Sequence, residues 1–212
     1  MAYLDEILEK YKEKKEEIAG RLKDFRDVWD KCDEKIFAEL CFCILTPQSK
    51  AESCDGIICK LEKNRLLFRG QTRQLWPYLK YTRFYRNKSR YLMEARRLFS
   101  AGGKIAIKDK IDVKDSKKTR DWLVAHVKGI GYKEASHFLR NIGFGDELAI
   151  LDIHILRSLV KLGVIDEMPK TLTPKRYLAI EEKVKLFADK VNIPMARLDL
   201  VLWSAGTNKI FK

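Results

Sequence analysis

The segment HVKGIGYKEASHFLRNIG, residues 126–143, constrains the fold more than any other part of the chain. Two helical apolar patterns meet in it, separated only by Lys128, Gly129, Ile130 and Gly131. Helices joined so tightly form a hairpin, in which glycine allows positive φ and close approach to the backbone. The N–H groups that open the second helix then form an anion site, and Ile130 anchors the turn in the core. An ordinary turn that needs glycine for geometry alone fits the same residues.

Helical apolar spacing continues along most of the chain. Apolar residues recur at steps of three and four with charged residues between them, which is the pattern of amphipathic helices. We expect helices over residues 3–29, 33–45, 49–63, 84–101, 116–127, 132–141 and 152–162, with two more from Pro174 and Pro194. The expected caps are Asp33, Ser116, Asp152 and Thr173. Only Ile105–Ile107 hints at a strand.

The predicted fold class is therefore all-α. We expect two helical lobes with an active-site cleft between them. One lobe comprises residues 33–143 and ends in the helix-hairpin-helix, and the other comprises residues 1–32 together with 144–212.

Charge and composition indicate the kind of partner. Lys and Arg number 43 against 30 Asp and Glu, a net charge of +13, which favours a polyanion. A hydrophobic content of 46% excludes a disordered basic tail. The longest apolar stretch, Ile36–Leu45, is broken by Glu39 and is shorter than the roughly 18 residues of a membrane span. No secretory signal is apparent, and the odd number of cysteines, five, fits buried thiols in a reducing compartment. We expect a cytoplasmic, nucleoid-associated monomer.

Several motifs resemble those of one enzyme family. The spacing KGIGYKEA is similar to the helix-hairpin-helix of the DNA glycosylase superfamily, and LDIH at residues 151–154 stands where that superfamily carries its essential aspartate. RFYRNKSRYL, GIGYKEASHFLRNIG and LDLVLW, with a lysine ending the chain, resemble the type 2 8-oxoguanine DNA glycosylase/AP lyases. The resemblance runs from about residue 33 to Lys212. It implies a bifunctional base excision repair enzyme that flips 8-oxoguanine out of double-stranded DNA, excises it and nicks the strand by β-elimination.

The resemblance implies two catalytic residues. Lys133, two residues beyond Gly131, is the expected nucleophile, because a neutral amine attacks the sugar C1′ and forms a Schiff base. The positive end of the helix dipole and nearby Lys128 disfavour a second cation there. Asp152, expected to cap a helix, would stabilise the oxocarbenium-like charge and help Lys133 lose its proton. The alternative interpretations are that Lys133 is a surface lysine that contacts a phosphate and that Asp152 is only a helix cap.

The resemblance also implies contacts with DNA. Gln48 would fill the gap left by the flipped base, Phe84 and Trp203 would stack on that base, and the α-carboxylate of Lys212 would accept a hydrogen bond from N7–H, which guanine lacks. Expected backbone contacts come from Lys128, Gly129, Gly131, His154 and Arg157. Arg83, Arg86, Lys88 and Arg90 are further candidates for phosphate contacts. The competing interpretations are that Phe84 and Trp203 belong to the core, that His154 is a packed histidine, that the basic residues form a solvated charged face, and that the end of the chain is a frayed tail.

No catalytic metal is expected. His126 and His137 stand eleven residues apart, whereas helical ligands need a spacing of three or four. Binding of a monovalent cation by the hairpin carbonyls is an alternative that the sequence leaves open.

Two other functions are compatible with the hairpin. One is excision of oxidised pyrimidines, as in endonuclease III relatives, although the four-cysteine cluster usual in that group is missing. The other is a non-catalytic DNA-binding module, which needs the glycines but neither Lys133 nor Asp152.

Overall fold

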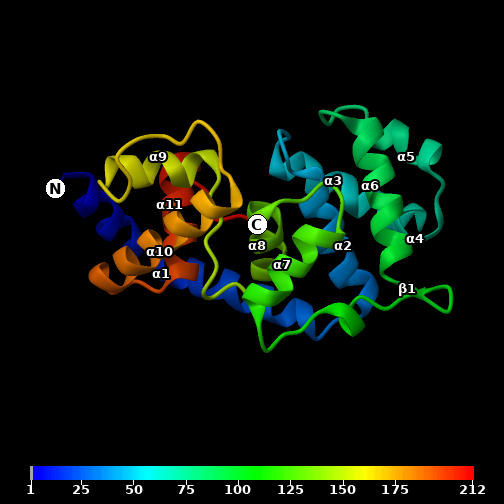
Figure 1. Cartoon of the computed structure of the whole chain (residues 1–212), viewed down its shortest axis with the longest axis horizontal. Coiled ribbons are helices and arrows are strands. Elements are labelled where there is room, and N and C mark those ends of the chain that lie inside the picture. Colours follow the sequence, from blue (N-terminus) through cyan, green and yellow to red (C-terminus); the bar gives the residue numbers. More distant parts are fainter. Residues whose placement is uncertain (1) are drawn as a thin grey trace.

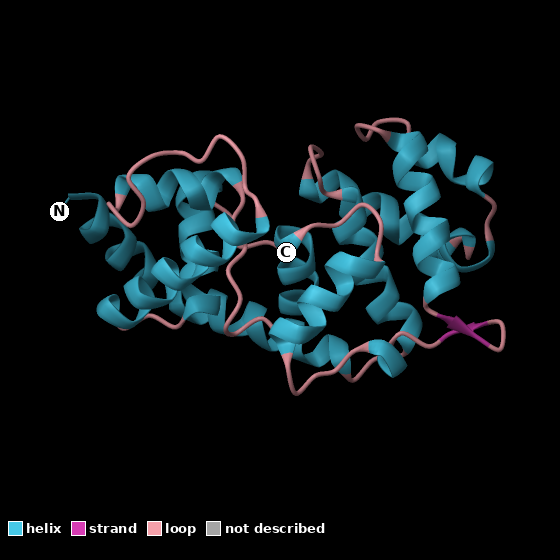
Figure 2. Ribbon diagram, in the orientation of Figure 1, coloured by secondary structure: helices cyan, strands magenta, loops and turns pink. Residues whose placement is uncertain are grey.

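The computed structural model describes residues 2–212 and confirms the all-α fold class (Figures 1 and 2). The helices are α1 (Ala2–Trp29), α2 (Asp33–Leu45), α3 (Ala51–Lys63), α4 (Leu66–Arg69), α5 (Thr72–Leu79), α6 (Tyr85–Leu98), α7 (Ser116–His126), α8 (Tyr132–Asn141), α9 (Ile153–Lys161), α10 (Pro174–Val191) and α11 (Met195–Thr207). Within the described residues, the only strands are β1 (Ser100–Ala101) and β2 (Lys104–Ile105), which pair in an antiparallel manner, and a 3-10 turn, η1, covers Lys108–Lys110.

Two hydrophobic clusters form the core. The first takes its buried side chains from residues 36–148 and includes most of α2, whose apolar residues are buried nearly all round. The second joins the buried face of α1 to residues 149–210. Helix α1 also reaches the first cluster, against which Val28 and Trp29 pack. The change from one cluster to the other falls between Leu148 and Ala149, and the long helix α1 ties the two together.

Buried ion pairs also join the two clusters. The guanidinium of Arg120 on α7 donates to both carboxylate oxygens of Glu181 on α10 at 2.6 and 2.9 Å, with the two side chains only 1% and 3% exposed. On α8, Arg140 pairs with Asp199 of α11 at 2.5 Å. Removing one partner of such a pair strands the other charge and typically costs about 3–5 kcal/mol. The pairs therefore fix how α7 and α8 sit against α10 and α11.

The helix starts agree with the sequence only in part. The predicted caps Asp152 and Thr173 are confirmed by their side-chain bonds to backbone N–H groups. Helix α2 begins instead after Cys32, because the carboxylate of Asp33 is occupied by the N–H of Lys108 at 2.9 Å. Helix α7 is capped by Asp115 rather than Ser116. Helices α4 and α5 were not predicted, since both are short and α5 contains a proline.

Two further findings concern the chain as a whole. Cys41, Cys43 and Cys54 are buried, but Cys32 and Cys59 are exposed, so the expectation of five buried thiols was wrong for two of them. Across residues 2–212, no helix combines the length and the apolar character that crossing a membrane requires.

Candidate active site

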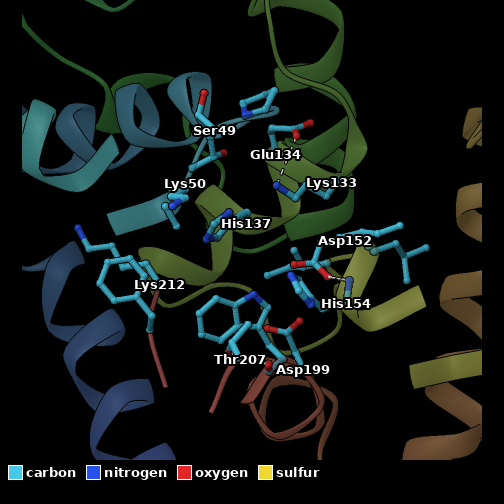
Figure 3. A pocket seen from close by; sticks show the side chains of 18 of the residues that line it. Ser49, Lys50, Lys133, Glu134, His137, Asp152, His154, Asp199, Thr207 and Lys212 are labelled. Atoms are coloured by element: carbon cyan, nitrogen blue, oxygen red, sulfur yellow. Dashed lines mark hydrogen bonds and ion pairs between the residues drawn. The ribbon is translucent and has the colours of Figure 1, made fainter. Parts of the chain in front are cut away.

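A cavity of about 870 Å³ lies where α8, the start of α9, α11, the loop before α3 and the last residues of the chain meet. Six of the predicted site residues line it: Gln48, Lys133, Asp152, His154, Trp203 and Lys212. Figure 3 shows Lys133, Asp152, His154 and Lys212 around this cavity. The others lie outside its lining: Phe84, Lys128, Gly129, Gly131 and Arg157. The structure thus brings both predicted catalytic residues to one cavity.

The hairpin turn places Lys133 in the first turn of α8. Gly129 has φ +89°, and a Cβ there would lie 2.3 Å from the Tyr91 ring, so both conformation and packing require glycine. Gly131, in contrast, is extended, and its N–H donates to Glu134 at 3.1 Å. The phosphate contact predicted at Gly131 therefore requires Glu134 to give up this bond. Ile130 packs against the first core cluster, as expected of the residue that anchors the turn.

The charged neighbours of Lys133 differ from the expected ones. Its Nζ lies 3.5 Å from Oε1 of Glu134, and the side chain is 23% exposed. Lys128, expected to repel a second cation here, instead pairs with Glu94 on α6 at 3.2 Å. The group within reach of the Lys133 amine is thus an anion, which the sequence analysis did not single out.

Asp152 is the N-cap of α9. Its Oδ1 accepts from the N–H groups of His154 and Ile155, both at 2.8 Å. The backbone segment before Asp152 is fixed by the hydroxyl of Tyr177, which donates a hydrogen bond to the Ala149 carbonyl at 2.6 Å. Two backbone N–H bonds and a tethered backbone hold the carboxylate in one position.

A lysine predicted to contact phosphate is instead internal. Lys88 on α6 is 3% exposed, and its Nζ donates to the carbonyls of Leu45 and Pro47 at 2.7 Å and to Ser49 Oγ at 2.9 Å. Burial lowers the pKa of Lys88. These bonds hold the loop that carries Gln48, which has a φ of +54°. The prediction that Lys88 lies at the surface was wrong, because only the folded structure brings its partners in the loop close to it.

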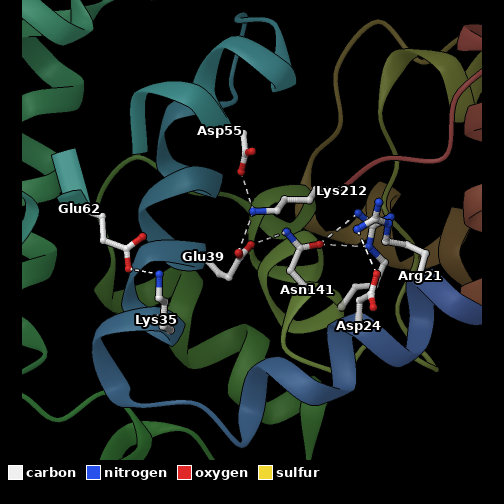
Figure 4. Close-up of polar contacts among 9 residues, drawn as sticks. Arg21, Asp24, Lys35, Glu39, Asp55, Glu62, Asn141 and Lys212 are labelled. Atoms are coloured by element: carbon white, nitrogen blue, oxygen red, sulfur yellow. Dashed lines mark hydrogen bonds and ion pairs between the residues drawn. The ribbon is translucent and has the colours of Figure 1, made fainter. Parts of the chain in front are cut away.

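Lys212 reaches into the cavity from the end of the chain. Its Nζ lies 2.8 Å from Glu39 and 2.6 Å from Asp55, and Asn141 donates to Glu39 at 3.1 Å (Figure 4). Although burial opposes it, Glu39 and Asp55 raise the pKa of Lys212. Its ammonium group is therefore committed to two carboxylates.

Two predicted contacts lie at the surface. Phe84, predicted to stack on the base, directly precedes α6 in the left-handed region with φ +59°. It is 53% exposed and lies under the guanidinium of Arg83. Arg157 is exposed on α9. Their roles stay predictions for the DNA-bound state.

The cavity residues to which the sequence analysis gave no role in the site include Glu134, His137, Arg140 and Asp199, of which His137 was considered only as a metal ligand. Burial raises the pKa of Asp199 to about 6 even though Arg140 beside it acts in the opposite direction. Within residues 2–212, no group of three or more His, Cys, Asp or Glu side chains is arranged to hold a metal ion.

Comparisons with known proteins identify the family of this chain. The family model of 8-oxoguanine DNA glycosylase with a helix-hairpin-helix matches residues 18–193. An 8-oxoguanine DNA glycosylase/AP lyase of Fusobacterium nucleatum is 49% identical, with 99% of this chain and 98% of that protein covered. One of Methanocaldococcus jannaschii is 41% identical over 96% of this chain and 95% of the relative.

Solved structures give the same result for the fold. The crystal structure of the M. jannaschii 8-oxoguanine glycosylase/lyase in complex with a 15mer DNA containing 8-oxoguanine has a TM-score of 0.90 and 38% identity, covering 100% of both chains. The Thermotoga maritima 8-oxoguanine DNA glycosylase has a TM-score of 0.87 and 32% identity, covering 99% of this chain and 98% of that one.

The fold and the cavity define a helix-hairpin-helix DNA glycosylase. More particularly, the chain belongs to the 8-oxoguanine DNA glycosylase family.

Proposed function

We propose that this protein excises 8-oxoguanine from double-stranded DNA and then cleaves the strand at the resulting abasic site, with Lys133 as nucleophile and Asp152 as its electrostatic partner. The observation that carries the proposal is that both side chains line one cavity large enough for a flipped base. Neither a helix cap nor a phosphate-binding lysine by itself requires such a cavity, so the site favours an enzyme over a non-catalytic module.

The chemistry assigns one task to each residue. The neutral amine of Lys133 forms a bond with C1′ as the C1′–N9 bond breaks, and the base leaves with the electron pair and takes up a proton. Asp152 stabilises the positive charge that develops on the sugar. The proton lost by Lys133 passes to a carboxylate, for which Glu134 stands 3.5 Å away. Ring opening gives the Schiff base, and loss of a proton from C2′ expels the 3′ phosphate.

The remaining predicted contacts belong to substrate binding. Trp203 and Lys212 already line the cavity, which supports their contact with the base, whereas Phe84 must turn inward to join them. Gln48 lines the cavity on the loop held by Lys88, which supports its predicted entry into the duplex. Backbone contacts from Lys128, Gly129, His154 and Arg157 would make binding fall steeply with salt. The proposal also includes binding of a monovalent cation by the hairpin carbonyls. It further includes association of the protein with the nucleoid.

Borohydride trapping tests the proposal. Wild-type protein mixed with a duplex containing 8-oxoguanine should form a covalent protein–DNA adduct, whereas Lys133→Gln should form none while still binding the duplex. Adduct formation by Lys133→Gln would contradict the assignment. Matched duplexes containing an oxidised pyrimidine distinguish the endonuclease III alternative, and the absence of product from every damaged duplex would favour the binding module.

A further inference from the structure

His137 has no assigned role, although it lies in the same cavity as Lys133. It stands four residues beyond Lys133 on α8, so both side chains project from one face of the helix. Figure 3 shows its ring between Lys133 and Lys212. The residue is only 6% exposed, and it is one of the residues that line the cavity.

The ring is buried without a hydrogen bond. Among residues 2–212, neither Nδ1 nor Nε2 has a partner, and the ring contacts the edge of Phe42 with centroids 5.5 Å apart. A buried polar group left unpaired costs about 1–3 kcal/mol, and such groups in native proteins call for an explanation. An unpaired ring that faces a cavity is explained if a bound molecule supplies the missing partner.

The surroundings keep the ring neutral. Burial lowers the pKa of His137 well below its ordinary value, the cations Arg140 and Lys133 act in the same direction, and the nearby backbone of Lys212 acts in the opposite one without reversing the shift. A neutral imidazole carries one N–H donor and one lone-pair acceptor. It is therefore suited to an uncharged polar partner, whereas a phosphate would favour a charged imidazolium.

The other polar groups of the cavity indicate which partner is missing. Asp152, Asp199 and Glu134 offer oxygens to the N–H groups of a base. Two of the cations are committed, since Lys212 pairs with Glu39 and Asp55 and Arg140 pairs with Asp199. Lys133 is assigned to the sugar. Of the buried polar residues that line the cavity within residues 2–212, His137 is the one whose ring nitrogens have no protein partner, so its N–H is available to a carbonyl oxygen of an oxidised purine.

We propose that His137 is a specificity-determining residue whose ring N–H donates a hydrogen bond to a carbonyl oxygen of the flipped oxidised purine. This rests on the proposed glycosylase function. The bond holds the base before and during cleavage of C1′–N9, and it takes no part in strand cleavage, by which time the base has left its sugar.

Replacing the ring by a nonpolar one of similar shape tests the proposal. His137→Phe keeps the contact with Phe42 and removes the donor. We expect single-turnover excision of 8-oxoguanine to fall about tenfold or more, the effect of one hydrogen bond to a buried group. Cleavage of a duplex with a preformed abasic site should change less than threefold. His126→Phe, at an exposed histidine outside the cavity, is the matched control.

Rescue identifies the donating nitrogen. The amide N–H of His137→Asn mimics Nδ1, and that of His137→Gln mimics Nε2, so one of them should restore most of the excision rate. Excision by His137→Phe at the wild-type rate, an equal loss of excision and abasic-site cleavage, or failure of both amides to restore excision would overturn the proposal. If the glycosylase function itself is wrong, the wild-type protein will release no 8-oxoguanine, which is a different result.

Discussion

On one side of the cavity, Lys133 and Glu134 stand in the first turn of α8 and Asp152 caps α9; we call these three residues the helical wall. On the other side, residues 46–50 and 209–212 are irregular backbone, which we call the loop wall. Backbone hydrogen bonds and a cap position the helical wall. The loop wall depends on two lysine side chains, Lys88 and Lys212. Chemistry is thus assigned to the more regular wall, and the loop wall forms the opposite side of the base pocket.

The largest effect should come from the helical wall. Asp152→Asn keeps an oxygen that accepts backbone N–H bonds but removes the negative charge opposite the sugar. We expect single-turnover excision to slow by about 10²–10³-fold, as for other losses of preorganised charge stabilisation. The affinity for an 8-oxoguanine duplex, measured by fluorescence anisotropy, should change little. An unchanged excision rate would show that Asp152 is only a helix cap.

Lys88→Met should weaken the loop wall by removing the side chain that supports it. It leaves the carbonyls of Leu45 and Pro47 without their donor. Each buried unpaired group costs about 1–3 kcal/mol, so thermal unfolding should occur at a lower temperature. Because Gln48 and its loop lose their support, excision should fall about tenfold while cleavage at a preformed abasic site falls less. Equal losses in both activities would mean that Lys88 supports the helical wall as well.

Lys212→Met tests the tail half of the loop wall. The substitution removes the ammonium group that joins Glu39 and Asp55 and leaves both carboxylates facing each other. We expect a drop in excision of about three- to tenfold and a weaker preference for 8-oxoguanine over guanine, measured as a ratio of single-turnover rates. An unchanged ratio would show that the position of the tail does not affect base selection.

Lys209→Ala should have the smallest effect. Lys209 pairs with Glu52 near Lys212, but the two side chains are 62% and 48% exposed. Exposed ion pairs contribute about 0–1 kcal/mol. Excision and the unfolding temperature should stay close to wild type, and a loss as large as that of Lys212→Met would remove the distinction between the two lysines.

The contrast between the two walls also explains which site residues could be predicted from the sequence. The starts of the helices that carry Lys133 and Asp152 follow from local signals, a glycine turn and a capping aspartate. Their catalytic roles and their meeting at one cavity were expected only from the resemblance to the DNA glycosylases. His137 and Asp199 carry no such signal, because an imidazole or carboxylate on an amphipathic helix has the same sequence pattern whether it faces a cavity or the core. Lys88 was misassigned for a related reason, since its three oxygen partners come from residues about forty positions away.

The pair of Arg120 and Glu181 has a consequence for DNA distortion. Spreading the two halves of the protein would separate two buried charges that now pair with each other. We therefore expect the base pocket to keep its width when a duplex binds, so that the work of extrusion falls on the nucleic acid. We expect damaged bases at weakly stacked steps or opposite poorly pairing partners to be released fastest.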